Sequence, residues 1–124
     1  DKQAAKEATQ ALIDDKRNNI LLITSEDYVS VGNLRTEGYL EALKDNDIFP
    51  DSDLIIKVKD KKGSQLEMSF LENELEKILK LKKVDAILGV NEIYAGSALK
   101  VLKKIKIKVP NQIAIISFTD GVIL

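Results

Sequence analysis

The stretch from Val84 to Asp120 constrains the fold more than any other part of the sequence. An apolar run, Val84–Gly89, is followed by a polar turn, a helical segment rich in small residues, and a second apolar run, Ile113–Ser117. Strands that alternate with helices in this way predict a parallel sheet with crossover helices. The polar turns after the two strands should then lie at the same edge of the sheet, where such sheets bind ligands.

The rest of the chain continues this alternation. Ile20–Thr24 is an unbroken apolar run, as expected for a parallel strand covered on both faces, and Leu54–Ile56 begins another strand. Apolar residues at helical spacing predict helices over residues 2–15, over residues 34–46, around residues 68–79 and after Asn91. The buried face predicted for the last helix consists of Ala95, Ala98, Leu99 and Leu102. One α/β domain is the prior expectation for 124 residues.

Composition excludes several classes of function. Histidine and cysteine are absent, so Ser-His-Asp triads, HExxH zinc sites, disulfides and thiolate chemistry are excluded. No glycine-rich phosphate-binding motif is present. A net charge of -1 provides no global basic field to hold nucleic acid, and no apolar run approaches the roughly 20 residues that cross a bilayer.

Charged residues allow two further interpretations. A paired-carboxylate site could be drawn from Glu26, Asp27, Asp85, Glu92 and Asp120, although such acids ordinarily cap helices and solvate turns. Lysines also gather near the ends of two predicted helices, at Lys80, Lys82 and Lys83 and again at Lys103, Lys104, Lys106 and Lys108. These lysines form either a phosphate-binding patch or, as is more usual, solvated helix ends that face the negative end of the helix dipole.

Arg35 is the most distinctive candidate for a ligand-binding residue. It falls in the first turn of the helix that is predicted to follow the first strand. A cation is mildly unfavourable at a helix N-terminus, so we expect an acidic side chain or a polar ligand to compensate it there. Asn91 occupies the matching place after the third strand, where helix capping is the commoner use of asparagine.

An ordered set of motifs resembles the lactose repressor/galactose repressor (LacI/GalR) family of bacterial transcription regulators. Arg35–Leu43 is similar to the family pattern "R..GF..AL", and Asp1 with Ala5, Ala8 and Leu12 is similar to its "D…A…A…L" helix. The family pattern "DAI…ND..A.GA….G..VP.D..V.GFD" resembles the segments Val84–Ile87, Asn91–Glu92, Ala95–Leu99, Val109–Pro110 and Ile113–Phe118. The resemblance covers nearly the whole chain.

The resemblance implies a fold and a domain assignment. The fold would be a flavodoxin-like, doubly wound parallel sheet with strand order 2-1-3-4, one lobe of a type I periplasmic-binding-protein-like structure with about four strands and four helices. Residues 1–124 would be most of the C-terminal lobe of an effector-binding domain. The helix-turn-helix domain and the N-terminal lobe would lie upstream of Asp1.

The resemblance also implies a function. The protein would be a cytoplasmic transcription regulator, by type a repressor, whose effector is a sugar or a sugar phosphate. It would be neither an enzyme nor a membrane protein, and it would need no cofactor. Operator DNA would be bound through the missing N-terminal domain and not through this chain. A homodimer is expected, formed partly by the helix after Asn91.

Carried over residue by residue, the resemblance places Arg35 on the family's effector-contacting arginine and Asn91 on its Asn/Asp position. Asp1 falls on an acidic position near the cleft, and Ser25 is expected on the same rim. An arginine fork suits bidentate bonds to vicinal hydroxyls or to a carboxylate.

Two departures from the pattern leave the ligand open. Glu92 replaces the usual Asp, and Thr119 stands where the family most often has its ligand-binding Asp, with Asp120 one position later. Either Asp120 substitutes through a shifted turn, or the ligand needs fewer carboxylate acceptors.

Two rival interpretations use the same fold. The first is a periplasmic sugar-binding protein, which a signal peptide upstream would distinguish from a regulator. The second is an enzyme of flavodoxin-like fold, such as a phosphotransfer domain or a carboxylate-based hydrolase. A receiver-type domain needs a phosphoacceptor Asp after the third strand, where this chain has Gly89-Val90-Asn91.

Overall fold

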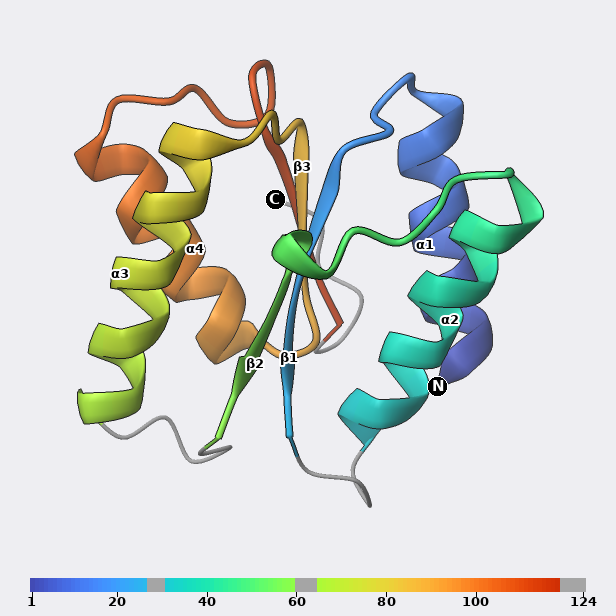
Figure 1. Cartoon of the computed structure of the whole chain (residues 1–124), viewed down its shortest axis with the longest axis horizontal. Helices are drawn as coiled ribbons and strands as arrows, with labels where there is room; N and C mark the ends of the chain where they lie inside the picture. The colour runs from blue at the N-terminus through green and yellow to red at the C-terminus, as the bar shows by residue number, and fades with distance from the viewer. Residues whose placement is uncertain (27–30, 60–64, 119–124) are drawn as a thin grey trace.

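A parallel four-stranded sheet lies between two layers of helices (Figure 1). The computed structural model describes residues 1–26, 31–59 and 65–118. The strands are β1 (Ile20–Ser25), β2 (Ile55–Val58), β3 (Ala86–Gly89) and β4 (Ala114–Ser117). The helices are α1 (Lys2–Asp14), α2 (Val31–Asp45), α3 (Gln65–Leu81) and α4 (Glu92–Lys104), with a short 3-10 turn at Ser52–Leu54. The strand order is β2-β1-β3-β4, which confirms the predicted topology.

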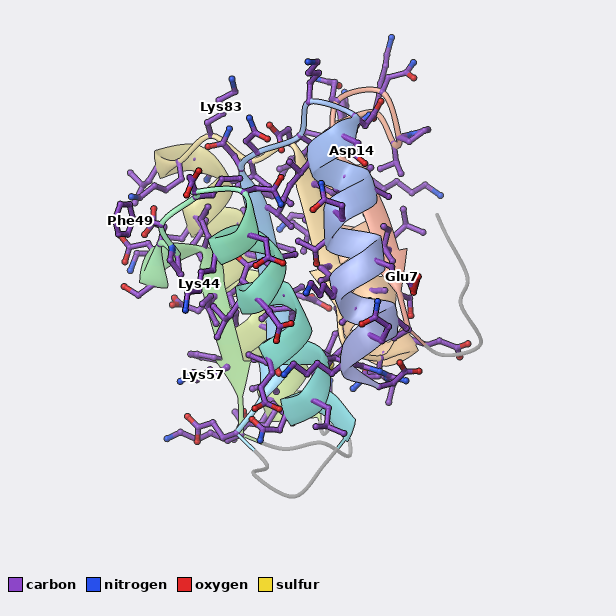
Figure 2. All side chains as sticks on the ribbon, turned by 90° about the vertical axis from the view of Figure 1, so that its right-hand side faces the viewer. Glu7, Asp14, Lys44, Phe49, Lys57 and Lys83 are labelled. Carbon is purple, nitrogen blue, oxygen red and sulfur yellow. The ribbon has the colours of Figure 1, made fainter. Side chains whose placement is uncertain are left out.

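Helices α1 and α2 pack side by side on one face of the sheet, and α3 and α4 cover the other (Figure 1). Gly38 of α2 makes the packing of α1 against α2 possible. A Cβ atom at that position would lie 2.2 Å from the main-chain oxygen of Lys2 and 2.8 Å from the Cβ of Ala5. Gly38 therefore allows α1 and α2 to approach each other closely. On the outer side of this pair, charged residues such as Glu7 and Asp14 project from α1 (Figure 2).

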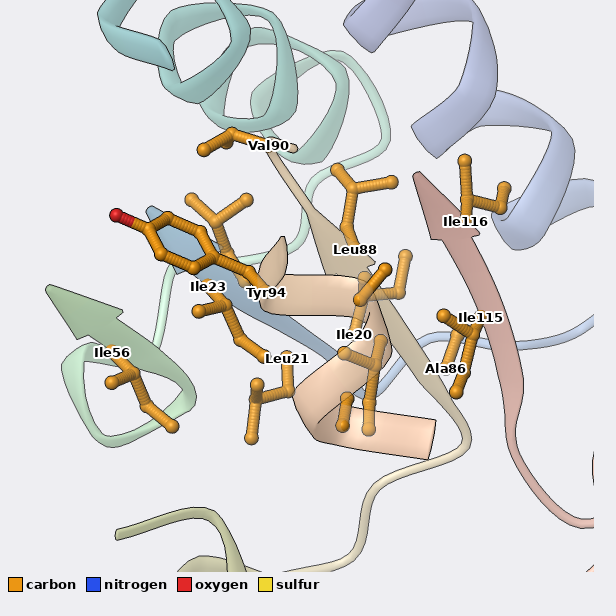
Figure 3. Close-up of a cluster of buried hydrophobic side chains, with 14 of the residues drawn as sticks. Ile20, Leu21, Ile23, Ile56, Ala86, Leu88, Val90, Tyr94, Ile115 and Ile116 are labelled. Carbon is orange, nitrogen blue, oxygen red and sulfur yellow. The ribbon is translucent and has the colours of Figure 1, made fainter. Parts of the chain in front are cut away.

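The core is built around β1, one of the two inner strands of the sheet. Four consecutive residues, Ile20–Ile23, are at most 1% exposed, as the unbroken apolar run predicted. Figure 3 shows Leu21 and Ile23 of β1 in one apolar cluster with Leu88 of β3 and Tyr94 of α4. Burial of one such side chain contributes about 1.5–3 kcal/mol relative to leaving it exposed.

Two local predictions are wrong. Helix α2 begins at Val31, three residues before the predicted start at Leu34, so Arg35 lies in its second turn and not in its first. Leu99 of α4 is 37% exposed, whereas Tyr94 and Val101 are buried. The buried stripe of α4 is centred on Ala98 and extends toward Tyr94, and Leu99 lies outside it because successive helical residues are rotated by about 100°.

Candidate functional site

The carboxyl ends of β1, β3 and β4 meet at one edge of the sheet, the lower edge in Figure 1, which we call the carboxyl edge. In the parallel register Gly89 pairs with Ser117, and Ile23 of β1 pairs with Gly89. The segments that follow these residues therefore leave the sheet together. The ends of the two strands share an edge, as predicted, whereas Thr119 and Asp120 of the turn after β4 lie outside the described residues.

Arg35 reaches from α2 to the ends of two neighbouring strands. Its Nη1 donates to the main-chain oxygen of Val90 at 2.5 Å, and its Nη2 donates to that of Phe118 at 3.2 Å. The guanidinium carbon lies 5.3 Å from the centre of the Phe118 ring, which adds a cation-π contact. Arg35 thus bridges the residues that follow β3 and β4, directly beside Asn91.

The Arg35 guanidinium is only partly satisfied by the described residues. Its Nε atom is buried without a hydrogen-bond partner. Burial lowers the pKa of Arg35 from its ordinary value, although an arginine remains protonated in proteins. The Val90 and Phe118 bonds use two of its five N–H donors. A half-buried cation whose described partners use two of its five donors is a suitable group for an anionic or hydroxyl-rich ligand.

A threonine pair holds α2 beside β1 at the same edge. The Oγ1 atoms of Thr24 and Thr36 lie 2.7 Å apart, and Thr24 is only 2% exposed. Because Thr36 follows Arg35 in α2, this bond fixes the helix next to the arginine. Sequence reasoning missed this pair, although a hydroxyl at the end of an otherwise apolar strand is a signal that could have indicated Thr24.

Asn91 is the N-cap of α4. Its Oδ1 accepts a hydrogen bond from the main-chain N–H of Tyr94 at 2.9 Å. This is the capping role that the sequence left open as the alternative to ligand binding. The cap fixes the amide at the carboxyl edge, one residue beyond the Val90 carbonyl that Arg35 binds.

Asp1 and Ser25 have different surroundings. Asp1 caps α1, accepting from the main-chain N–H of Ala4 at 3.1 Å, and it lies at the carboxyl-edge end of the molecule (Figure 1). Ser25 is the last residue of β1 and is half-buried. The structure therefore brings Arg35 and Asn91 together. Thr119 and Asp120, the other predicted ligand residues, lie outside the described residues.

Ser117 was not predicted as a site residue. It is the last residue of β4 and 2% exposed, yet its Oγ is buried without a hydrogen-bond partner. An unsatisfied buried hydroxyl is unfavourable by roughly 1–3 kcal/mol. As the last residue of β4, Ser117 lies at the carboxyl edge of the sheet. Within the described part of the chain, no group of three or more His, Cys, Asp or Glu side chains is arranged to hold a metal ion.

Comparison with known proteins identifies the family. The periplasmic binding protein-like domain matches residues 9–124. The chain belongs to this family of periplasmic binding protein-like domains. No curated protein matches the chain in sequence. Among the described helices, none is long and apolar enough to cross a membrane.

Solved structures of periplasmic binding protein-like regulators share the fold. A sugar-binding transcriptional regulator of the LacI family from Escherichia coli, complexed with phosphate, is 26% identical over 96% of this chain, with a TM-score of 0.81. The Escherichia coli transcriptional repressor ascG is 26% identical over 96% of the chain, with a TM-score of 0.80. The regulator CcpA of Lactococcus lactis, 24% identical over 97% of the chain with a TM-score of 0.78, shows the fold alone.

These matches confirm the LacI/GalR resemblance. The chain spans less than half of these proteins, covering 41% of the length of each Escherichia coli protein and 42% of the length of CcpA.

Proposed function

We propose that this chain is the C-terminal lobe of the effector-binding domain of a cytoplasmic LacI/GalR-type transcription regulator, by type a repressor, and that its effector is a sugar or a sugar phosphate. The proposal rests on the family match, on the LacI-family structures that share the fold, and on the residues gathered at the carboxyl edge. One of those structures is described as a sugar-binding regulator complexed with phosphate.

The bridge that Arg35 makes between Val90 and Phe118 is the observation that carries the proposal. It holds a cation at the point where β3 and β4 end, with donors left for a second partner. A guanidinium binds vicinal hydroxyls, a carboxylate or a phosphate in bidentate geometry. In a doubly wound sheet, ligands bind at this edge.

Other residues of the carboxyl edge would complete the contacts. The capping bond of Asn91 uses Oδ1, so Nδ2 is the donor that this amide can offer to an effector. Ser25, Asp1, Thr119 and Asp120 are proposed as further ligand-binding residues. Ser117, with its unpaired hydroxyl, joins them.

In the proposed regulator, closure over the effector and DNA binding would involve domains outside this chain. A second lobe would close over the effector, and closure would shift the population between operator-bound and released states. Operator DNA would be read by an upstream domain. Exposed apolar residues support a homodimer through α4 and the neighbouring α3: Ile93 and Leu99 on α4, and Leu66 and Phe70 on α3.

A thermal-shift screen of sugars and sugar phosphates on the full-length protein tests the proposal. We expect at least one to raise the melting temperature in a concentration-dependent manner and to change operator affinity. Stabilisation by no sugar, together with stabilisation by an unrelated class such as an amino acid, would contradict the proposed effector class.

A further inference from the structure

Positive charge is concentrated in one part of this nearly neutral chain. Residues 77–113 contain nine lysines and two acids, a net charge of +7. The whole chain has a net charge of -1, so the remainder carries -8. All nine lysines are exposed. Lysines that face the negative ends of α3 and α4 do not account for all of this charge, because Lys106 and Lys108 lie beyond the last turn of α4.

Most of these lysines are gathered at the end of the molecule opposite the carboxyl edge. There α3 and α4 both end, and the segment after α4 passes near the end of α3 (Figure 1). Lys83 projects outward from this end (Figure 2). Among the described residues, Lys82 pairs with Asp51 and Lys104 with Glu76.

Five lysines at this end have no ion pair with a described residue: Lys80, Lys83, Lys103, Lys106 and Lys108.

A groove with an apolar floor lies among these lysines. It has a volume of about 410 Å³ and is lined by Leu79, Lys82, Lys83, Val84, Ile107, Gln112 and Ile113. Leu79, Val84 and Ile107 are only half-buried, so their side chains remain in contact with solvent. Beside the groove, Leu81 at the end of α3 is 73% exposed. Of the two lysines that line the groove, Lys82 pairs with Asp51 and Lys83 has no ion pair with a described residue, while Lys106 and Lys108 flank Ile107 of the lining in the sequence.

The far wall of the groove is fixed in place. The main-chain N–H of Ile107 donates to the oxygen of Leu102 at 2.9 Å, which closes the end of α4. The main-chain N–H of Lys108 donates to the side-chain oxygen of Gln112 at 2.7 Å. Arg17 donates to the main-chain oxygen of Pro110 at 2.9 Å. A partner would therefore meet an ordered surface, which reduces the entropy lost on binding.

We propose that this lysine-rimmed groove docks an acidic, amphipathic segment of another protein. Apolar side chains of the segment would cover Leu79, Val84 and Ile107, while its carboxylates would pair with Lys83, Lys106 and Lys108. Charge complementarity identifies this occupant, since the rim carries unpaired cations and the floor is apolar. The proposal is independent of the effector site.

Nucleic acid fits the groove less well. Residues 77–113 contain no arginine, the residue that most often binds phosphate in bidentate fashion, and Arg17 beside the groove already donates to Asp15, Asp85 and Pro110. No aromatic side chain lines the groove to stack on a base. A duplex would bring phosphates to the lysines but would leave the apolar floor uncovered.

Fluorescence anisotropy of this chain with a labelled synthetic peptide tests the proposal. The peptide carries leucine on one helical face and aspartate and glutamate on the other. We expect it to bind at low ionic strength and to bind roughly tenfold more weakly to the triple variant Lys83→Gln, Lys106→Gln, Lys108→Gln. The matched control is Lys44→Gln, Lys57→Gln, Lys59→Gln, which removes the same charge from exposed lysines outside residues 77–113 and should bind like the wild type; Figure 2 labels Lys44 and Lys57.

Two further probes distinguish binding of an amphipathic acidic segment from binding of any acidic peptide and from binding of DNA. A scrambled peptide of the same composition should bind more weakly than the patterned one, and a short DNA duplex should bind more weakly still. The proposal is overturned by absence of peptide binding, by equal loss in both triple variants, by equal binding of the scrambled peptide, or by tighter binding of the duplex.

Discussion

Arg35 of α2 binds the main-chain oxygen of Val90 at 2.5 Å, joining a helix on one face of the sheet to the end of β3. The two residues are 55 positions apart in the sequence. The same side chain binds the carbonyl of Phe118. One arginine therefore both stabilises the strand ends and presents a cation where they meet.

Arg35→Ala should lower the free energy of unfolding of this chain by about 1–3 kcal/mol, because two charged hydrogen bonds are lost and two partly buried carbonyls lose their partner. The free energy of unfolding of Arg35→Lys should lie between those of Arg35→Ala and the wild type, since an ammonium cannot span both carbonyls. Urea denaturation followed by circular dichroism measures both. The exposed Lys44→Ala serves as control, and an equally large loss there would show that Arg35 does not bridge the strands.

Gly38→Ala should destabilise the chain by about 1–3 kcal/mol, because the new Cβ would overlap the main chain of Lys2 and force α1 away from α2. Gly96→Ala in α4 is the matched control, since nothing lies within 4 Å of a Cβ there. Alanine is the better helix former, so this control should gain about 0.5–1 kcal/mol. Thermal unfolding measures both variants. A loss of stability in Gly38→Ala together with a gain in Gly96→Ala supports the contact between α1 and α2, whereas a gain in both variants would contradict it.

The loss of folding stability at acidic pH should depend on Glu41. Hydrogen bonds from Lys2 and Lys6 lower the pKa of this carboxyl from near 4.5 to about 2. The stabilisation is therefore fully present above pH 4.5 and is lost as the pH falls toward 2. We expect Glu41→Gln to reduce the dependence of the urea midpoint on pH in that interval, whereas Glu7→Gln, on the outer side of α1, should leave it unchanged. Identical pH profiles for the wild type and Glu41→Gln would refute the role of these pairs.

Three helices, α1, α2 and α4, are each followed two residues later by a residue with left-handed backbone: Lys16 (φ 67°), Asp47 (φ 57°) and Lys106 (φ 63°). Glycine adopts this conformation without the steric penalty that a Cβ brings, so Lys16→Gly and Asp47→Gly should each stabilise the chain by up to about 1 kcal/mol. Lys16→Ala keeps the Cβ and should show no such gain. Calorimetric melting compares the three variants, and a gain for alanine equal to that for glycine would rule out the backbone explanation.

The sequence was sufficient for the topology and for the position of two site residues. The unbroken apolar runs and the helical spacing between them predicted a parallel sheet, because parallel strands require crossover helices, and the family resemblance implied the strand order. Arg35 and Asn91 were placed at the carboxyl edge for the same reason. Each of these patterns is local and can be recognised within a short stretch of sequence.

The sequence did not reveal contacts that depend on tertiary register. The contact between Arg35 and Phe118 joins residues 83 positions apart, and the Thr24–Thr36 bond depends on how α2 lies on β1. The start of α2 was missed because Gly32 and Asn33 are typical of a loop, yet the helix continues through them. The charge separation was visible in the sequence, but the groove between the lysines was not.

Isothermal titration calorimetry on the full-length protein tests the central claim most directly. The wild type and Arg35→Ala are compared with the sugar or sugar phosphate that the thermal-shift screen identifies, after circular dichroism confirms that the variant is folded. We predict that the wild type binds the effector and that the folded variant shows no measurable binding. An affinity in Arg35→Ala equal to that of the wild type would contradict the assignment of the carboxyl edge as the effector site.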